Sequence, residues 1–262
     1  MPKKSKIIEF PHLRALLEQD DANRAENAAG KQASDSAPEP EGEKKSIWQE
    51  LRDIELPTAL QSKEVMLCTV AVPQDYPSMA VSVLVDMSGS MQGARMNSAM
   101  RAAMLLYDFA TGLGIPVMVA GHNTQTRGCA EYYVFSRFDA IGKQDAFRLA
   151  KLSTGGCNRD GAAIAASVGL LAKRPEEVKL MFVISDGQPN DGNYSGSSAR
   201  ADTQNIVKSA RRNGIEVFAA AIGNDKEHIQ AIYGDGFLDI TDLSKFPKML
   251  TGMVKKRILR NI

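Results

Sequence analysis

The sequence lacks the features that mark secreted, zinc-binding and membrane-spanning proteins. Its three cysteines, Cys68, Cys129 and Cys157, are far apart and include no C-x-x-C pair, so neither a disulfide framework nor a structural zinc site is predicted. No apolar run approaches the roughly 20 residues of a membrane helix, and the basic start "MPKKSKIIEFPHL" is not followed by the apolar core of an export signal. These absences favour a protein of the reducing cytoplasm.

The sequence also lacks an excess of either charge. Lys and Arg number 32 against 31 Asp and Glu, which gives a net charge of +1, so a broad surface for nucleic acid or an anionic membrane is not predicted. Hydrophobic residues make up 44% and charged residues 24% of the chain, as is ordinary for a soluble globular protein. Any electrostatic function must therefore be local.

Changes in amino-acid composition divide the chain into four segments. Residues 1–19 form a short N-terminal segment with enough apolar side chains for a helix. Residues 20–45 are rich in Ala, Glu, Pro, Ser and Gly and lack aromatic and large aliphatic side chains, which predicts a disordered acidic linker. Residues 46–64 are interpreted as a helical lead-in, and residues 65–262 as the main domain.

In the main domain, strand patterns alternate with helix patterns. The apolar runs "MAVSVLVD" (79–86) and "VKLMFVISD" (178–186) are typical of strands buried in a parallel sheet. Residues 65–72 are predicted to form a strand, residues 95–112 a helix that stops at Gly112, and residues 242–258 a final helix. Residues 115–122 and 130–138 are predicted to form a hairpin. The alternation predicts an α/β fold with a doubly wound, mostly parallel sheet flanked by helices. Ligands of such sheets bind at the carboxyl ends of the strands.

Three polar turns fall at that expected edge of the sheet. They are "DMSGS", "STGGCNRDGAA" and "SDGQPND". Their candidate metal ligands are Asp86, Ser88 and Ser90 in the first turn, Asn158 and Asp160 in the second, and Asp186 in the third. Converging carboxylates repel one another unless a cation lies between them. Because the set has oxygen donors and no Cys or His, it favours Mg²⁺, with Mn²⁺ or Ca²⁺ as alternatives.

The same residues could in principle belong to other kinds of site. The stretch "GCNRDGAA" has alanines where a nucleotide phosphate loop needs lysine and a hydroxyl, and the Rossmann fingerprint is absent. A nucleophilic Ser88 or Ser90 would need a base, and among the histidines only His122 falls at a strand end on the ligand face, where it is interpreted as a rim residue. The first turn could also simply cap the following helix.

The motifs of the first and third turns resemble those of a known domain family. "DMSGSM", followed about 100 residues later by "ISDGQP", resembles the metal-ion-dependent adhesion site of von Willebrand factor A domains. "NRDGAAI", "VISDGQPND" and "AAIGND" are similar to the C-terminal A domain of the larger partner subunit of aerobic cobaltochelatase. The resemblance implies that Asp86 and Asp186 anchor the cation, that Ser88 and Ser90 donate hydroxyl oxygens, and that a partner's carboxylate completes the coordination.

The second turn departs from that family pattern. Most A domains present a threonine there, whereas this chain has Asn158 and Asp160. Spacing favours the amide oxygen of Asn158 as the equivalent ligand, and chemistry favours the carboxylate of Asp160, which can act through a water. Cys157 is predicted to be a small packed residue without a ligand role, and Arg159 to point away from the cation, either solvated or paired with an acid of the partner.

The function expected from this resemblance is metal-dependent protein binding without catalysis. The implied partner is a ring-forming AAA+ ATPase of the chelatase and MoxR kind, in a remodelling or metal-insertion complex. The alternative is a metal-dependent hydrolase, similar to a phosphatase or nuclease, that uses the same cation to activate water.

Overall fold

A computed structural model of the chain describes the main domain from its first long strand to near the C-terminus. The described residues are 5–9, 67–71, 78–126, 128–139, 142, 144–221 and 226–239. The predicted linker, the helical lead-in and a helix expected near the C-terminus lie outside these residues.

The core of the domain is a six-stranded sheet in the order β5-β4-β3-β6-β7-β8. Its strands are β3 (Met79–Asp86), β4 (Val117–Asn123), β5 (Glu131–Ser136), β6 (Val178–Ser185), β7 (Ile215–Ala221) and β8 (Phe237–Asp239). Neighbouring strands are parallel, except that β5 runs antiparallel to β4. The predicted doubly wound, mostly parallel sheet and the β4–β5 hairpin are confirmed.

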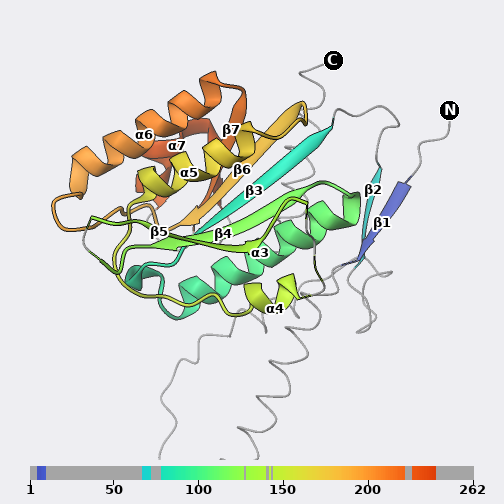
Figure 1. The fold of residues 1–262 in the computed structure, drawn as a ribbon, viewed down its shortest axis with the longest axis horizontal. Helices are drawn as coiled ribbons and strands as arrows, with labels where there is room; N and C mark the ends of the chain where they lie inside the picture. Colours follow the sequence, from blue (N-terminus) through green and yellow to red (C-terminus); the bar gives the residue numbers. More distant parts are fainter. Residues whose placement is uncertain are drawn as a thin grey trace, which may run out of the picture.

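Helices cover both faces of this sheet (Figure 1). They are α3 (Ala94–Leu113), α4 (Asp145–Leu149), α5 (Asp160–Ala172), α6 (Gly196–Arg212) and α7 (Lys226–Tyr233), with short 3-10 turns η2 (Gly89–Met91) and η3 (Gly234–Gly236). One buried apolar cluster lies under α3 and α4, and a second lies under α5, α6 and α7. Every residue of β3 is buried, because helices enclose the strand from both sides.

Helix α3 ends later than its sequence suggests. Gly112, the expected stop, lies inside the helix, which continues to Leu113. The C-cap is Gly114, in the left-handed region at φ 75°, a conformation that costs glycine little because it has no Cβ.

The N-terminal segment contains a strand where a helix was expected. β1 (Ser5–Glu9) pairs antiparallel with β2 (Leu67–Ala71), with Ser5 opposite Ala71. Strand preference depends on cross-strand partners more than on local sequence. The expectation of a helix is wrong for residues 7–9, whose pairing partners lie about 60 residues further along the chain. Residues 10–19 lie outside the described residues. The strand expected at 65–72 is present as β2.

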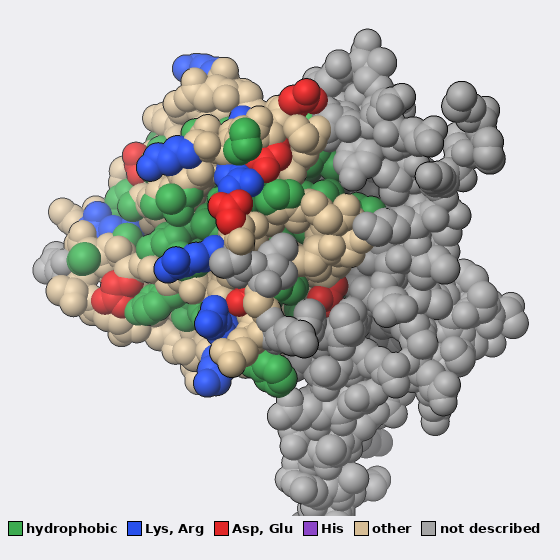
Figure 2. Space-filling view, turned by 45° about the vertical axis from the view of Figure 1, so that its right-hand side comes forward, with side chains coloured by type: hydrophobic (Ala, Val, Ile, Leu, Met, Phe, Trp, Pro, Cys, Tyr) green, Lys and Arg blue, Asp and Glu red, His purple; other side chains and the backbone are tan. Residues whose placement is uncertain are grey.

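Charges on the described surface are mixed in sign. Figure 2 shows Lys and Arg side chains interspersed with Asp and Glu over one face of the domain. Among the helices of the described ranges, none combines the length and the apolar surface that crossing a bilayer requires.

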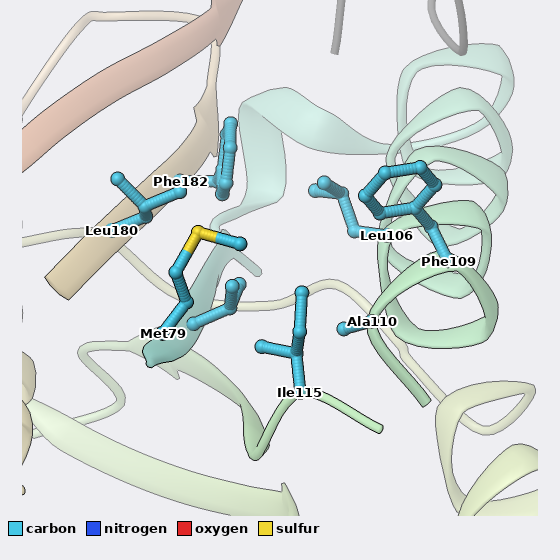
Figure 3. A pocket seen from close by; sticks show the side chains of 8 residues that line it. Met79, Leu106, Phe109, Ala110, Ile115, Leu180 and Phe182 are labelled. Atoms are coloured by element: carbon cyan, nitrogen blue, oxygen red, sulfur yellow. The ribbon is translucent and has the colours of Figure 1, made fainter. Parts of the chain in front are cut away.

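A small apolar cavity lies at the amino end of the sheet, between the strands and α3 (Figure 3). It is lined by Met79, Val81, Leu106, Phe109, Ala110, Ile115, Leu180 and Phe182. These side chains offer no polar group to orient a ligand, and all are buried or nearly so in the hydrophobic core. The polar turns lie at the other end of the same strands, around Asp86.

Candidate metal centre

Three loops meet at the carboxyl end of the sheet. They are the first loop (87–93) after β3, the second loop (150–159) before α5, and the third loop (186–195) after β6. β4 and β6 pair with β3 on opposite sides, so β3 and β6 flank the topological switch point, where open α/β sheets bind ligands. The three predicted polar turns therefore come together.

The second loop is held against the end of β3 and β4 by main-chain hydrogen bonds. Gly89 donates its N–H to the Gly156 carbonyl at 3.0 Å, and Gly155 donates to the Met87 carbonyl at 2.8 Å. Gly156 has φ 69°, and a Cβ there would lie 2.3 Å from the carbonyl oxygen of Thr124. The two glycines of "STGGC" thus allow the close approach that brings Asn158 to the site.

Asp86 is the hydrogen-bonding centre of the site. It is the last residue of β3 and is fully buried. One carboxylate oxygen accepts the Ser88 N–H at 2.8 Å, and the other accepts the Asn158 amide and the Ser185 hydroxyl, each at 3.0 Å. Ser185 was not identified from sequence, although its place directly before Asp186 at the end of a buried strand was a usable signal.

The hydroxyls of Ser88 and Ser90 lie together beside this carboxylate. Their Oγ atoms are 3.1 Å apart. Ser88 is buried and Ser90 is exposed. Neither η2, whose N-cap is Ser88, nor α3, whose N-cap is Gly93, has a side-chain cap hydrogen bond. The alternative that these serines simply cap a helix is therefore not supported.

Burial and neighbouring carboxylates disfavour the ionised forms of Asp160 and Asp186. Burial raises the pKa of Asp160 well above its usual range, and the charges of Asp86 and Asp186 add to the effect. Burial also raises the pKa of Asp186, where the Ser90 hydroxyl opposes the shift and the charge of Asp86 adds to it. A carboxyl with a raised folded-state pKa destabilises the fold as pH rises from its unfolded pKa to the raised value. A cation would relieve this cost at neutral pH.

The donor set fits a hard cation. In the part of the chain that the structure describes, no group of three or more His, Cys, Asp and Glu side chains has the spacing of a metal cluster. A cation here would therefore need oxygen donors besides carboxylates, which the Ser88 and Ser90 hydroxyls could supply. Mg²⁺ takes few protein oxygens and keeps waters in its shell, which matches this arrangement.

Asn158 directs its amide nitrogen, not its oxygen, toward the carboxylates. Its Nδ2 donates to Asp86 and to Asp160, each at 3.0 Å. Its Oδ1 accepts the Asn190 N–H at 2.8 Å. Reversing the amide would set Nδ2 against the Asn190 N–H and lose all three bonds. As it stands, Asn158 positions Asp86 and Asp160 and ties the second loop to the third.

Arg159 contacts two side chains of its own chain, those of Asp191 and Tyr194. Its Nε lies 2.5 Å from Asp191 Oδ2, and its guanidinium lies 5.0 Å from the centre of the Tyr194 ring. It is thus not simply solvated. Cys157, expected to be packed, is exposed; its main chain pairs with Thr124 in an isolated bridge, while its side chain is left accessible to solvent.

His122 was interpreted as a rim residue, and that was wrong. It is fully buried, as is every residue of β4, and it lies opposite Asp86 in the parallel register of β3 and β4. Its Nε2 lies 3.7 Å from Asp160 Oδ1, and neither ring nitrogen has a hydrogen bond within the described part of the chain. Burial lowers its pKa, although the charge of Asp86 opposes the shift, which favours a neutral imidazole at the back of the site.

Arg95 contacts the site from the first turn of α3. Its Nη1 donates to the Ser90 carbonyl at 3.1 Å and lies 3.4 Å from Asp186 Oδ2. Arg95 was not identified from the sequence, because a single arginine near the start of a helix is typical of an ordinary solvent-exposed position.

Residues 81–238 match the von Willebrand factor type A (VWA) domain family. The chain belongs to this family. The VWA domain is 28% identical to Protein NorD of Brucella suis over 188 residues, which cover 68% of this chain and 29% of that protein. It is 27% identical to the uncharacterized protein YojO of Bacillus subtilis over 194 residues, 69% of this chain and 30% of that protein. The chain thus spans less than a third of these relatives' length.

Solved structures share the fold of this VWA domain at low sequence identity. The vWF domain of the type V pili tip protein Mfa5 from Porphyromonas gingivalis superposes with a TM-score of 0.56 at 10% identity, over 70% of this chain and 97% of that one. The PilB minor pilin from Streptococcus sanguinis gives 0.53 at 16% identity, over 71% and 63%. These likenesses concern the fold alone.

Proposed function

We propose that this VWA domain is a divalent-metal-dependent protein-binding module with a metal-ion-dependent adhesion site. The observation that carries the proposal is the convergence of buried carboxylates and paired serine hydroxyls at the switch point of the sheet. The residues are Asp86, Ser88, Ser90, Asp160 and Asp186. Because the carboxylates destabilise one another's ionised forms, a bound cation would be linked to folding.

Each residue has a distinct part in this proposal. Asp86 and Asp186 would hold Mg²⁺ directly or through water, and Ser88 and Ser90 would donate hydroxyl oxygens. Asp160 would act through a water, whereas Asn158 could become a ligand only by exchanging its present amide hydrogen bonds. Mn²⁺ or Ca²⁺ could replace Mg²⁺. When bound, the cation supplies a positive charge that can accept a carboxylate from a protein partner.

The partner we propose is a ring-forming AAA+ ATPase of the MoxR and chelatase kind, in a cytoplasmic remodelling or metal-insertion complex. Support comes from the motifs "NRDGAAI" and "VISDGQPND", which resemble the A domain of the cobaltochelatase partner subunit. The chain carries no nucleotide phosphate loop of its own, so a separate ATPase would supply the energy. We propose no catalytic step for the domain itself.

Calorimetry with the second-loop variants tests the metal assignment. We expect the wild type to bind Mg²⁺ at millimolar or lower concentrations. Asp160→Ala should weaken binding about 10-fold, in the range for residues that act through an outer shell, because it removes a negative charge from the site. Asn158→Ala should weaken binding less, because the amide presents no oxygen to the cation.

Two results would count against this assignment. The absence of Mg²⁺ and Mn²⁺ binding by the wild type at millimolar concentrations would contradict the metal site as a whole. A larger loss in Asn158→Ala than in Asp160→Ala would instead reverse the roles of the two residues. In parallel, metal-dependent release of phosphate or cleavage of nucleic acid by the purified chain would favour the hydrolase alternative.

A further inference from the structure

The contact between Arg95 and Asp186 has a consequence for metal binding that depends on the proposed function. Asp186 is almost fully buried, and its side chain carries one of the negative charges that would hold the cation. Arg95 Nη1 approaches Oδ2 of this carboxylate at 3.4 Å and also donates to the Ser90 carbonyl at 3.1 Å. The guanidinium therefore bridges the first and third loops at the mouth of the site.

We propose that Arg95 is a built-in counter-ion that competes with the divalent cation for Asp186. A guanidinium has only N–H donors and cannot coordinate a metal. A cation bound to either oxygen of Asp186 shares this small carboxylate with Arg95, so the two positive charges repel each other. Because Asp186 is buried, the repulsion is screened less than it would be between surface charges.

Because Arg95 is partly exposed, a divalent cation could displace it from Asp186. Its side chain is 36% exposed, whereas that of Asp186 is 1% exposed. The arginine can turn toward solvent on a long side chain while Asp186 stays in place. Without metal, Arg95 offsets part of the negative charge at the site. When metal binds, Arg95 is displaced from Asp186. Losing this interaction keeps the affinity for the cation lower than the oxygen donors alone would give.

If Arg95 competes with the cation, replacing it should lower the stability of the metal-free protein but raise its affinity for Mg²⁺. In Arg95→Gln, the metal-free protein loses a counter-charge and should melt about 2–4 °C lower, the shift expected from one partly buried ion pair in a domain of this size. The same variant should bind Mg²⁺ about 3- to 10-fold more tightly, because a nearby positive charge has been removed. Arg95→Lys keeps the charge and should bind Mg²⁺ much as the wild type does.

The experiment is a melting curve in chelator and a Mg²⁺ titration by calorimetry, on the full chain and its variants. The matched control is Arg148→Gln, since Arg148 Nη1 lies 3.1 Å from the buried Asp145 in α4, outside the metal centre. This control also loses one positive charge beside a buried aspartate, but it should leave Mg²⁺ affinity unchanged.

The outcomes separate this inference from the proposed function. If Arg95→Gln melts lower and binds Mg²⁺ more tightly, competition is supported. If it binds Mg²⁺ equally or more weakly while the wild type binds normally, Arg95 only positions Asp186 and the inference is overturned. If the wild type itself binds no Mg²⁺, the proposed metal site is wrong and this inference is wrong with it.

Discussion

Asp86→Ala is expected to abolish the response of the domain to Mg²⁺ and to destabilise the metal-free fold. The wild type should gain about 1.4 kcal/mol, or about 3–6 °C in melting temperature, at a Mg²⁺ concentration ten times the dissociation constant. The variant should show no gain. In chelator it should lose about 2–4 kcal/mol, because the donors of Ser88, Asn158 and Ser185 are left buried without their acceptor. The loss is not larger, because removing the Asp86 charge also removes its repulsion with Asp160 and Asp186.

The control for this prediction is Asp145→Ala. Asp145 is also a buried aspartate, and it accepts hydrogen bonds from the Ser136 hydroxyl and the Gly142 N–H, each at 3.0 Å. Its replacement should lower the melting temperature but preserve the response to Mg²⁺. Thermal melts with and without Mg²⁺ compare the two variants. An Asp86→Ala protein that Mg²⁺ still stabilises as it does the wild type would exclude Asp86 as a ligand.

Binding to a MoxR-type AAA+ ATPase is expected to require the cation of this domain. With Mg²⁺ present, Ser88→Ala should bind the purified ATPase at least about 10-fold more weakly, because the hydroxyl that faces Ser90 is missing from the coordination shell. Binding should be lost in chelator, and the isolated chain should show no ATP turnover. Biolayer interferometry measures the affinity in each condition.

The serine variant is needed because an AAA+ ATPase uses Mg²⁺ for its own nucleotide. Loss of binding in chelator alone could therefore arise from the partner. Ser198→Ala removes a hydroxyl from the exposed start of α6, outside the metal centre, and should bind like the wild type. If Ser88→Ala also binds like the wild type, the metal centre is not the docking surface.

Most of the six-stranded sheet could be predicted because its central strands are recognisable from their own apolar sequences. The run "MAVSVLVD" is apolar at nearly every position, and such a strand requires cover on both faces, which fixes the parallel, doubly wound class. β1 could not be predicted, since its partner is remote. Helix α7 and strand β8 were also missed. Both are short, and β8 is a strand of three residues that pairs with the end of β7.

The location of the site could be predicted, but the directions of its side chains could not. Asp86 and Asp186 follow apolar strands, and the carboxyl ends of parallel strands meet at one edge. The amide of Asn158 could not be oriented from sequence, because the Asn190 N–H that fixes it belongs to the third loop. His122 was misplaced for a similar reason. A residue at the end of a strand can lie at the rim or be buried, and His122 is buried because β4 is covered along its whole length and on both faces.

A crystal structure of the chain soaked in Mn²⁺, with anomalous diffraction at the manganese edge, tests the metal centre most directly. One strong peak is expected between the first and third loops. The peak should lie about 2.0–2.2 Å from the Ser88 and Ser90 hydroxyl oxygens and within about 6 Å of Asp160, which allows direct or single-water coordination. No peak at saturating Mn²⁺, or a peak with neither Asp86 nor Asp186 within that reach, would contradict the proposed metal centre.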